Sequence, residues 1–144
     1  MKKHLFFVCP TDNLESIIDL KFKHKNYYLS SLGNSMTFNE EIVNEIDMLI
    51  KRFKITEIIF VLGSNNKIIN DALADQEFSN IKVLRPLYKE ITLQNKLLKA
   101  LWKPSNIILP IISSHLNKKI KELSLKMRTL SIAQQNMHAH VFDI

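Results

Sequence analysis

Glycine and cysteine are both scarce in this sequence of 144 residues, and each scarcity excludes a class of site. Only Gly33 and Gly63 are glycines, so a glycine-rich phosphate loop and a glycine-rich linker are both excluded. The one cysteine, Cys9, excludes an intramolecular disulfide framework and any metal site built from several cysteines. Because such cysteine usage is typical of a reducing compartment, we expect a cytoplasmic protein.

Long hydrophobic runs are also missing. The apolar run at residues 5–9 is too short for the core of a signal peptide, and no stretch reaches the roughly 18 apolar residues that a membrane-spanning helix needs. We therefore expect no membrane partner. The composition, 46% hydrophobic and 24% charged, is that of an ordinary globular protein, and the length predicts one domain over residues 1–144.

The formal net charge is +6, which raises the question of an acidic partner. The lysines are spread along the chain without interleaved aromatic residues, and this pattern disfavours nucleic-acid binding. One helix predicted at residues 115–130 carries a basic face. That face fits either an acidic partner or, as is more common, a solvated lysine surface.

Strand patterns and helix patterns alternate along the chain. Short apolar runs predict strands at residues 4–9, 25–32, 55–62, 81–85 and 138–144. Helical periodicity predicts helices at residues 14–20, 38–53, 67–74, 88–102 and 115–130, whereas residues 106–112 fit either type. This alternation predicts an α/β fold with a mainly parallel central sheet flanked by helices.

Capping signals accompany two of the predicted helices. Thr37 and Glu40 have the spacing of a capping box at the start of the helix at 38–53. Asp12 or Asn13 is the predicted cap of the helix at 14–20.

Two polar loops follow the predicted strands at 4–9 and 55–62. The first is Cys9–Asn13 and the second is Gly63–Lys67. Because ligands bind beyond the carboxyl ends of parallel strands, both loops are candidates for a site.

The order of these elements resembles that of the β-class carbonic anhydrases. The matching segments are "FFVCPTDN", "YYLSSLGN", the helix at 38–53, "IIFVLGSNNKI" and "HVFDI". The resemblance extends over nearly the whole chain and implies the fold of that family. It also implies a homodimer, because members of the family are generally dimers or larger assemblies.

The resemblance implies a zinc site whose ligands are largely replaced here. In the family, zinc is held by a cysteine of the first loop and by a histidine and a cysteine of the second. Cys9 matches the first ligand, whereas Ser64 and Lys67 stand at the other two positions. A hydroxyl is a poor zinc ligand and an ammonium group repels a cation. We therefore expect no metal, no cofactor and no zinc-dependent hydration of carbon dioxide.

The polar partners of the family's zinc site are changed as well. The aspartate and arginine of the first loop fall on Thr11 and Asn13, with Asp12 one position away, and the arginine of the glycine segment falls on Ser30. We hypothesise that the Lys67 ammonium replaces part of the lost metal charge and faces Cys9. The pocket residues that we expect around this pair are Thr11, Asp12, Asn13, Asn34, Ser64, Asn65 and Asn66.

Three functions are compatible with this altered site. The first is a binding protein without hydratase activity, retained to bind a small anion or to interact with a partner. The second is an enzyme that uses Cys9 as a reactive thiolate, since a neighbouring cation favours the thiolate form. The third is a carbonic anhydrase with a rebuilt metal site, for which His138 and His140 are the candidate ligands. The first is the prediction that we carry forward.

Overall fold

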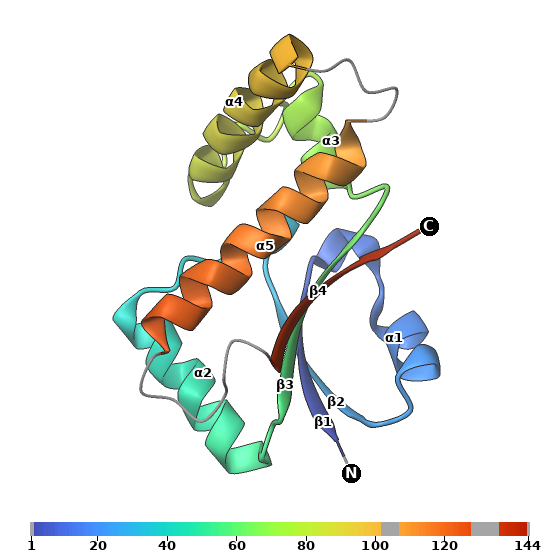
Figure 1. Cartoon of the computed structure of the whole chain (residues 1–144), viewed down its shortest axis with the longest axis vertical. Coiled ribbons are helices and arrows are strands. Elements are labelled where there is room, and N and C mark those ends of the chain that lie inside the picture. The colour runs from blue at the N-terminus through green and yellow to red at the C-terminus, as the bar shows by residue number, and fades with distance from the viewer. Residues whose placement is uncertain (1, 102–106, 128–135, 144) are drawn as a thin grey trace.

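The computed structural model describes residues 2–101, 107–127 and 136–143, and these residues form a parallel sheet with helices on both faces (Figure 1). The four strands of this part of the chain are β1 (Lys3–Val8), β2 (Lys25–Ser30), β3 (Glu57–Gly63) and β4 (Met137–Phe142). Their order is β2-β1-β3-β4, and each neighbouring pair is parallel. The predicted fold class is confirmed.

The two central strands are apolar along nearly their whole length because both of their faces are covered. Leu5, Phe7 and Cys9 point to one face, while Phe6 and Val8 point to the other. This alternation is the ordinary consequence of the two-residue period of a strand. It divides the hydrophobic core between the two faces of the sheet.

The larger core lies under α2 (Glu40–Phe53) and α5 (Ile108–Lys126), and the smaller core lies under α1 (Glu15–Lys21) (Figure 1). The remaining helices, α3 (Lys67–Leu73) and α4 (Arg85–Leu101), lie beyond the carboxyl ends of the strands (Figure 1). Short 3-10 turns η1 (Pro10–Asp12), η2 (Leu32–Asn34) and η3 (Lys82–Leu84) connect these elements. No helix of the described ranges is long and apolar enough to span a membrane.

The strand predicted at residues 81–85 is wrong, because this segment forms η3 and the first residue of α4. Pro86 is the reason: it lies in the first turn of α4, where a missing N–H leaves no hydrogen bond unmade. The ambiguous segment at 106–112 is resolved in the same way. Pro110 lies in the first turn of α5, so the described residues 108–112 are helical.

Both predicted helix caps are wrong. The cap of α2 is Asn39, whose side chain accepts a hydrogen bond from the Ile42 N–H at 2.9 Å. Leu14 occupies the cap position of α1 without any side-chain cap. The side chain of Asp12 is used in a contact between loops instead.

Candidate functional site

The two loops predicted from the sequence meet at the carboxyl edge of the sheet, and Asp12 joins them. One carboxylate oxygen of Asp12 accepts the backbone N–H of Gly63 at 2.8 Å. The other accepts the side-chain amide of Asn66 at 3.0 Å. Both oxygens of the only carboxylate in the first loop therefore hold the second loop in place.

Cys9 is fully buried directly below this contact, with 0% of its surface exposed. Its Sγ accepts the backbone N–H of Gly33 at 3.1 Å and lies 3.1 Å from the Thr11 hydroxyl oxygen. The side chain also belongs to the larger hydrophobic core. Cys9 thus packs as a small buried residue with polar partners on two sides.

The turn that supplies the N–H to Cys9 requires glycine. Gly33 has a φ of +62°, and a Cβ built there would lie 2.8 Å from Cγ2 of Ile68. The next residue, Asn34, is buried and donates its amide to Phe7 O at 3.1 Å and to Val61 O at 2.8 Å. Asn34 therefore fastens β1 to β3 at their carboxyl ends.

Asn66 begins α3. Its Oδ1 accepts the N–H groups of Ile68 and Ile69, each at 3.0 Å, so it is the N-terminal cap of this helix. Its amide also donates to Asp12, so both polar side-chain atoms of the fully buried Asn66 make hydrogen bonds within the protein. Asn34 and Asn66 both have structural roles here, and that they line a ligand pocket stays a prediction.

Lys67, Asn65 and Asn13 are exposed at the same edge. The described residues form no hydrogen bond or ion pair with the Lys67 ammonium, and the partners of the Cys9 sulfur are Gly33 and Thr11. The Cys9–Lys67 pairing hypothesised from the sequence therefore receives no contact in this structure.

The sequence reasoning missed Asp143, which follows β4 and reaches the same edge. Its carboxylate accepts the Ser64 hydroxyl at 3.3 Å, and the Ser64 N–H donates to Phe142 O at 2.7 Å. The signal was available, because the last strand of a parallel sheet must also end at this edge. Two carboxylates, those of Asp12 and Asp143, therefore lie at the two loops.

His115 of α5 is a second residue that the sequence reasoning did not place. Its Nε2–H donates to Gly33 O at 2.8 Å, while the Gly33 N–H donates to Cys9, so the backbone of Gly33 lies between His115 and Cys9. Burial lowers the pKa of His115, although the Gly33 carbonyl opposes this shift. The neutral imidazole is thus part of the support for the Cys9 loop.

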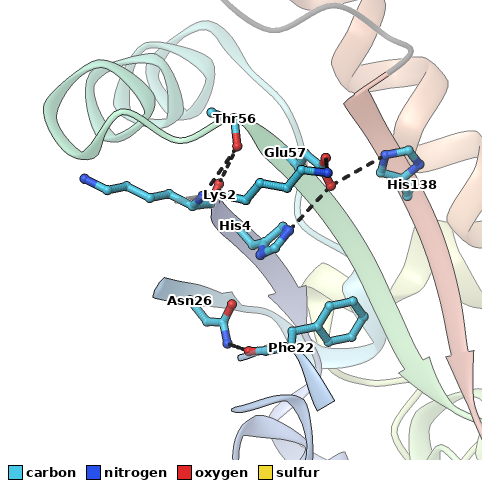
Figure 2. Close-up of polar contacts among 8 residues, drawn as sticks. Lys2, His4, Phe22, Asn26, Thr56, Glu57 and His138 are labelled. Carbon is cyan, nitrogen blue, oxygen red and sulfur yellow. Dashed lines mark hydrogen bonds and ion pairs between the residues drawn. The ribbon is translucent and has the colours of Figure 1, made fainter. Parts of the chain in front are cut away.

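His138 and His140, the candidate metal ligands, and also His4, lie away from these loops. His4 and His138 approach the carboxylate of Glu57 at the amino end of the sheet, at 3.5 Å and 3.9 Å, and Lys2 lies 3.3 Å from its other oxygen (Figure 2). His140 contacts the Lys21 ammonium at 3.2 Å. None of these contacts brings a histidine to Cys9.

The residues around Cys9 do not fit zinc. A zinc site is built from thiolate, imidazole and carboxylate groups in a tetrahedral set. Here the two loops hold one thiol and the two carboxylates of Asp12 and Asp143, and no imidazole. The Cys9 sulfur and Asp12 already accept backbone N–H groups, and Asp143 accepts the Ser64 hydroxyl. In the described part of the chain, no three His, Cys, Asp or Glu side chains are placed to hold a metal ion.

The chain has a β-carbonic-anhydrase-like fold, and hydrogen bonds within the protein engage polar groups of the two loops at the carboxyl edge of its sheet. Solved structures agree with this fold. A tetrameric β-carbonic anhydrase of the filamentous ascomycete Sordaria macrospora superimposes with a TM-score of 0.71 over 99% of this chain and 76% of its own, at 17% identity. The wild-type β-carbonic anhydrase CafD of Aspergillus fumigatus gives 0.67 over 99% and 84%, at 13% identity. No protein-family model and no curated protein matches the sequence.

Proposed function

We propose that this chain is a binding protein built on the β-carbonic anhydrase fold, without a catalytic zinc and without carbon dioxide hydration activity. The observation that carries the proposal is the pair of contacts made by Asp12 to Gly63 and Asn66. These contacts occupy both oxygens of the one carboxylate in the first loop. The partners of the Cys9 sulfur are a hydroxyl group and a backbone N–H, which are poor zinc ligands.

An enzyme using Cys9 as a nucleophile receives less support. A reactive cysteine is partly exposed and lies in an electropositive surrounding. Cys9 is fully buried, and its sulfur lies against a hydroxyl and a backbone N–H. A rebuilt metal site at the histidines of β4 receives no support either, because His138 and His140 have separate partners.

In this proposal the protein binds either a small anion or a partner protein. We further propose that it is cytoplasmic and forms a homodimer. The carboxylates of Asp12 and Asp143 disfavour an anion directly between the two loops. The exposed side chains of Asn13, Asn65 and Lys67 can reach a partner at this edge, although Asn65 Oδ1 also accepts the Asn70 amide at 3.3 Å. The relatives from Sordaria macrospora are tetrameric, which supports self-association. Light scattering at several concentrations tests the homodimer.

The proposed loss of hydratase activity is tested by a stopped-flow assay of carbon dioxide hydration in the presence of zinc. We expect the unmodified chain to give the uncatalysed rate. A double variant, Ser64→His with Lys67→Cys, restores the two ligands implied by the family and is expected to retain zinc after gel filtration. Hydration by the unmodified chain that disappears in Cys9→Ser would overturn the proposal.

A further inference from the structure

A cavity of about 420 Å³ lies away from the Cys9 loops, between α4 and the turn that follows α3. This volume falls within the range of small-molecule sites, which is about 300–1,000 Å³. The described residues that line it are Gln76, Ser79, Arg85, Tyr88, Lys89, Thr92, Leu93 and Lys96, and none of them is acidic.

Three of the lining residues are cations on one face of α4. Arg85, Lys89 and Lys96 follow one another at spacings of four and seven residues, which places them on one side of a helix. Among the described residues, none of the three has an ion-pair partner within 4.0 Å. A cavity with three cations and no carboxylate favours an anionic ligand.

A second cavity, between α4 and α5, shows the contrast. It measures about 310 Å³ and also contains lysines, Lys118 and Lys119. Lys118 forms an ion pair with Glu90, and Lys119 lies 3.2 Å from Glu122 and donates to Met36 O at 3.0 Å. These charges are compensated inside the protein, whereas those of the first cavity are not.

The floor of the first cavity is fixed by hydrogen bonds. Gln76 has a left-handed backbone with a φ of 54°, and its side-chain amide donates to Ala72 O and to the Thr92 hydroxyl, each at 2.9 Å. The Tyr88 hydroxyl donates to Asp71 at 2.5 Å. These contacts hold the turn against α4, so the cavity is formed before any ligand binds.

The carboxylate that takes part in this network is Asp71, and its oxygens accept hydrogen bonds from within the protein. Besides the Tyr88 hydroxyl, it accepts the N–H groups of Glu77 at 2.8 Å and Phe78 at 3.0 Å. Three donors, two N–H groups of the turn and one hydroxyl of α4, therefore compensate its negative charge. The cations on α4 keep their charge for a ligand.

We propose that this cavity binds a small organic phosphate, with its phosphate group on Arg85 and Lys89, its apolar part against Leu93, and Lys96 adding positive charge at the far end. The guanidinium group of arginine matches phosphate oxygens with paired N–H donors, and the lysines add point charges. Leu93 is 58% exposed beside these cations and offers an apolar contact. The site is separate from Cys9 and does not depend on whether the protein holds zinc.

The test compares phenyl phosphate with inorganic phosphate by isothermal titration calorimetry and by amide chemical-shift mapping. We expect phenyl phosphate to bind more tightly and to shift amides of residues 76–79 and 85–96. The pair Lys89→Gln with Lys96→Gln is expected to weaken binding about tenfold or more, as charged hydrogen bonds of this type are lost. The matched control is Lys121→Gln with Lys126→Gln on α5, which changes the net charge equally and should leave the affinity unchanged.

Three results would overturn the proposal. One is an equal loss of affinity in the α4 double variant and in the α5 control, which would mean that binding depends only on net charge. Another is the absence of any preference for phenyl phosphate over inorganic phosphate. The last is a single-stranded oligonucleotide that binds more tightly than phenyl phosphate at 150 mM salt, roughly the physiological ionic strength. That result would make the α4 face a polyanion surface.

Discussion

The polar residues of the two loops act mainly on the backbone of their neighbours. Asp12 accepts from the second loop, Asn66 caps α3, and Asn34 fastens two strands. Their positions could be predicted from the sequence, because they follow apolar strands. Their roles could not be predicted, because a shift of one residue in the first loop would turn the Asp12 side chain from Gly63 to the solvent. That choice depends on the backbone of η1, including the left-handed conformation of Asn13.

Replacing Asp12 with alanine should destabilise the protein by about 2 kcal/mol. The change leaves the Gly63 N–H and the Asn66 amide without their acceptor, and hydrogen bonds to charged groups contribute roughly 1.5–3 kcal/mol each before exposure reduces them. Urea unfolding measures the loss. The control is Asp75→Ala, an exposed aspartate, for which we expect a change within about 0.5 kcal/mol. Equal effects of the two substitutions would contradict the role of Asp12.

Cys9 should react slowly with a thiol reagent in the folded protein. Its full burial means that the reagent reaches the sulfur only after local opening. Labelling by a disulfide reagent, followed by absorbance, should be slow in buffer and rapid in denaturant. Lys67→Met should leave the native rate unchanged, because the two side chains share no contact. A rapid reaction of the folded protein that slows in Lys67→Met would instead support the hypothesis that Lys67 stabilises a Cys9 thiolate.

At the scale of single elements, helix and strand types follow from periodicity, while their ends depend on local competition. The apolar stripe of α2 predicts the helix, yet Asn39 rather than Thr37 caps it. Both residue types favour cap positions, so the sequence alone does not choose between them. Pro86 follows an apolar run that predicts a strand, but in the structure it lies in the first turn of α4.

The two capping candidates of α2 give a direct comparison. Asn39→Ala should cost about 1 kcal/mol, because the Ile42 N–H loses its acceptor at the start of the helix. Thr37→Ala should change stability by less than about 0.5 kcal/mol, since this side chain caps nothing. Thermal unfolding of both variants beside the parent chain measures the difference. A larger loss in Thr37→Ala would contradict the observed cap.

The contact between α5 and the Gly33 turn should make stability depend on pH. Burial lowers the pKa of His115 below its ordinary value of 6.5, so the unfolded chain binds a proton at a pH where the folded chain does not. Stability is therefore complete above about pH 6.5 and falls as the pH drops below this value. The fall continues until the pKa of the folded state is passed.

The variant His115→Gln tests this dependence, because its amide can still donate to Gly33 O but does not titrate. Urea unfolding at pH 7.5 and pH 5.5 should show a smaller loss of stability on acidification than in the parent chain. His4 and His140, whose pKa values are also lowered by burial, account for the slope that remains. If the loss of stability between pH 7.5 and pH 5.5 is the same in His115→Gln as in the parent chain, His115 does not cause the pH dependence.

At the scale of the whole molecule, the alternation of apolar runs predicts the parallel sheet, and the structure confirms it. The β-carbonic anhydrase resemblance is confirmed as a likeness of fold, through solved structures that share 17% identity or less with the chain. The phosphate cavity could not be predicted, because its cations are separated along α4 by apolar residues that face the core. Which of the lysines line the cavity depends on the position of the turn after α3, which Gln76 holds against α4 and which the sequence does not reveal.

The central claim is our proposal that this chain holds no zinc at the two loops, where hydrogen bonds within the protein engage Cys9 and Asp12. The most direct measurement is the zinc content of the purified protein after equilibration with zinc and gel filtration, by plasma mass spectrometry. We predict far less than one zinc ion per chain, with the same value in Cys9→Ser. One zinc ion per chain, lost in Cys9→Ser, would contradict the account.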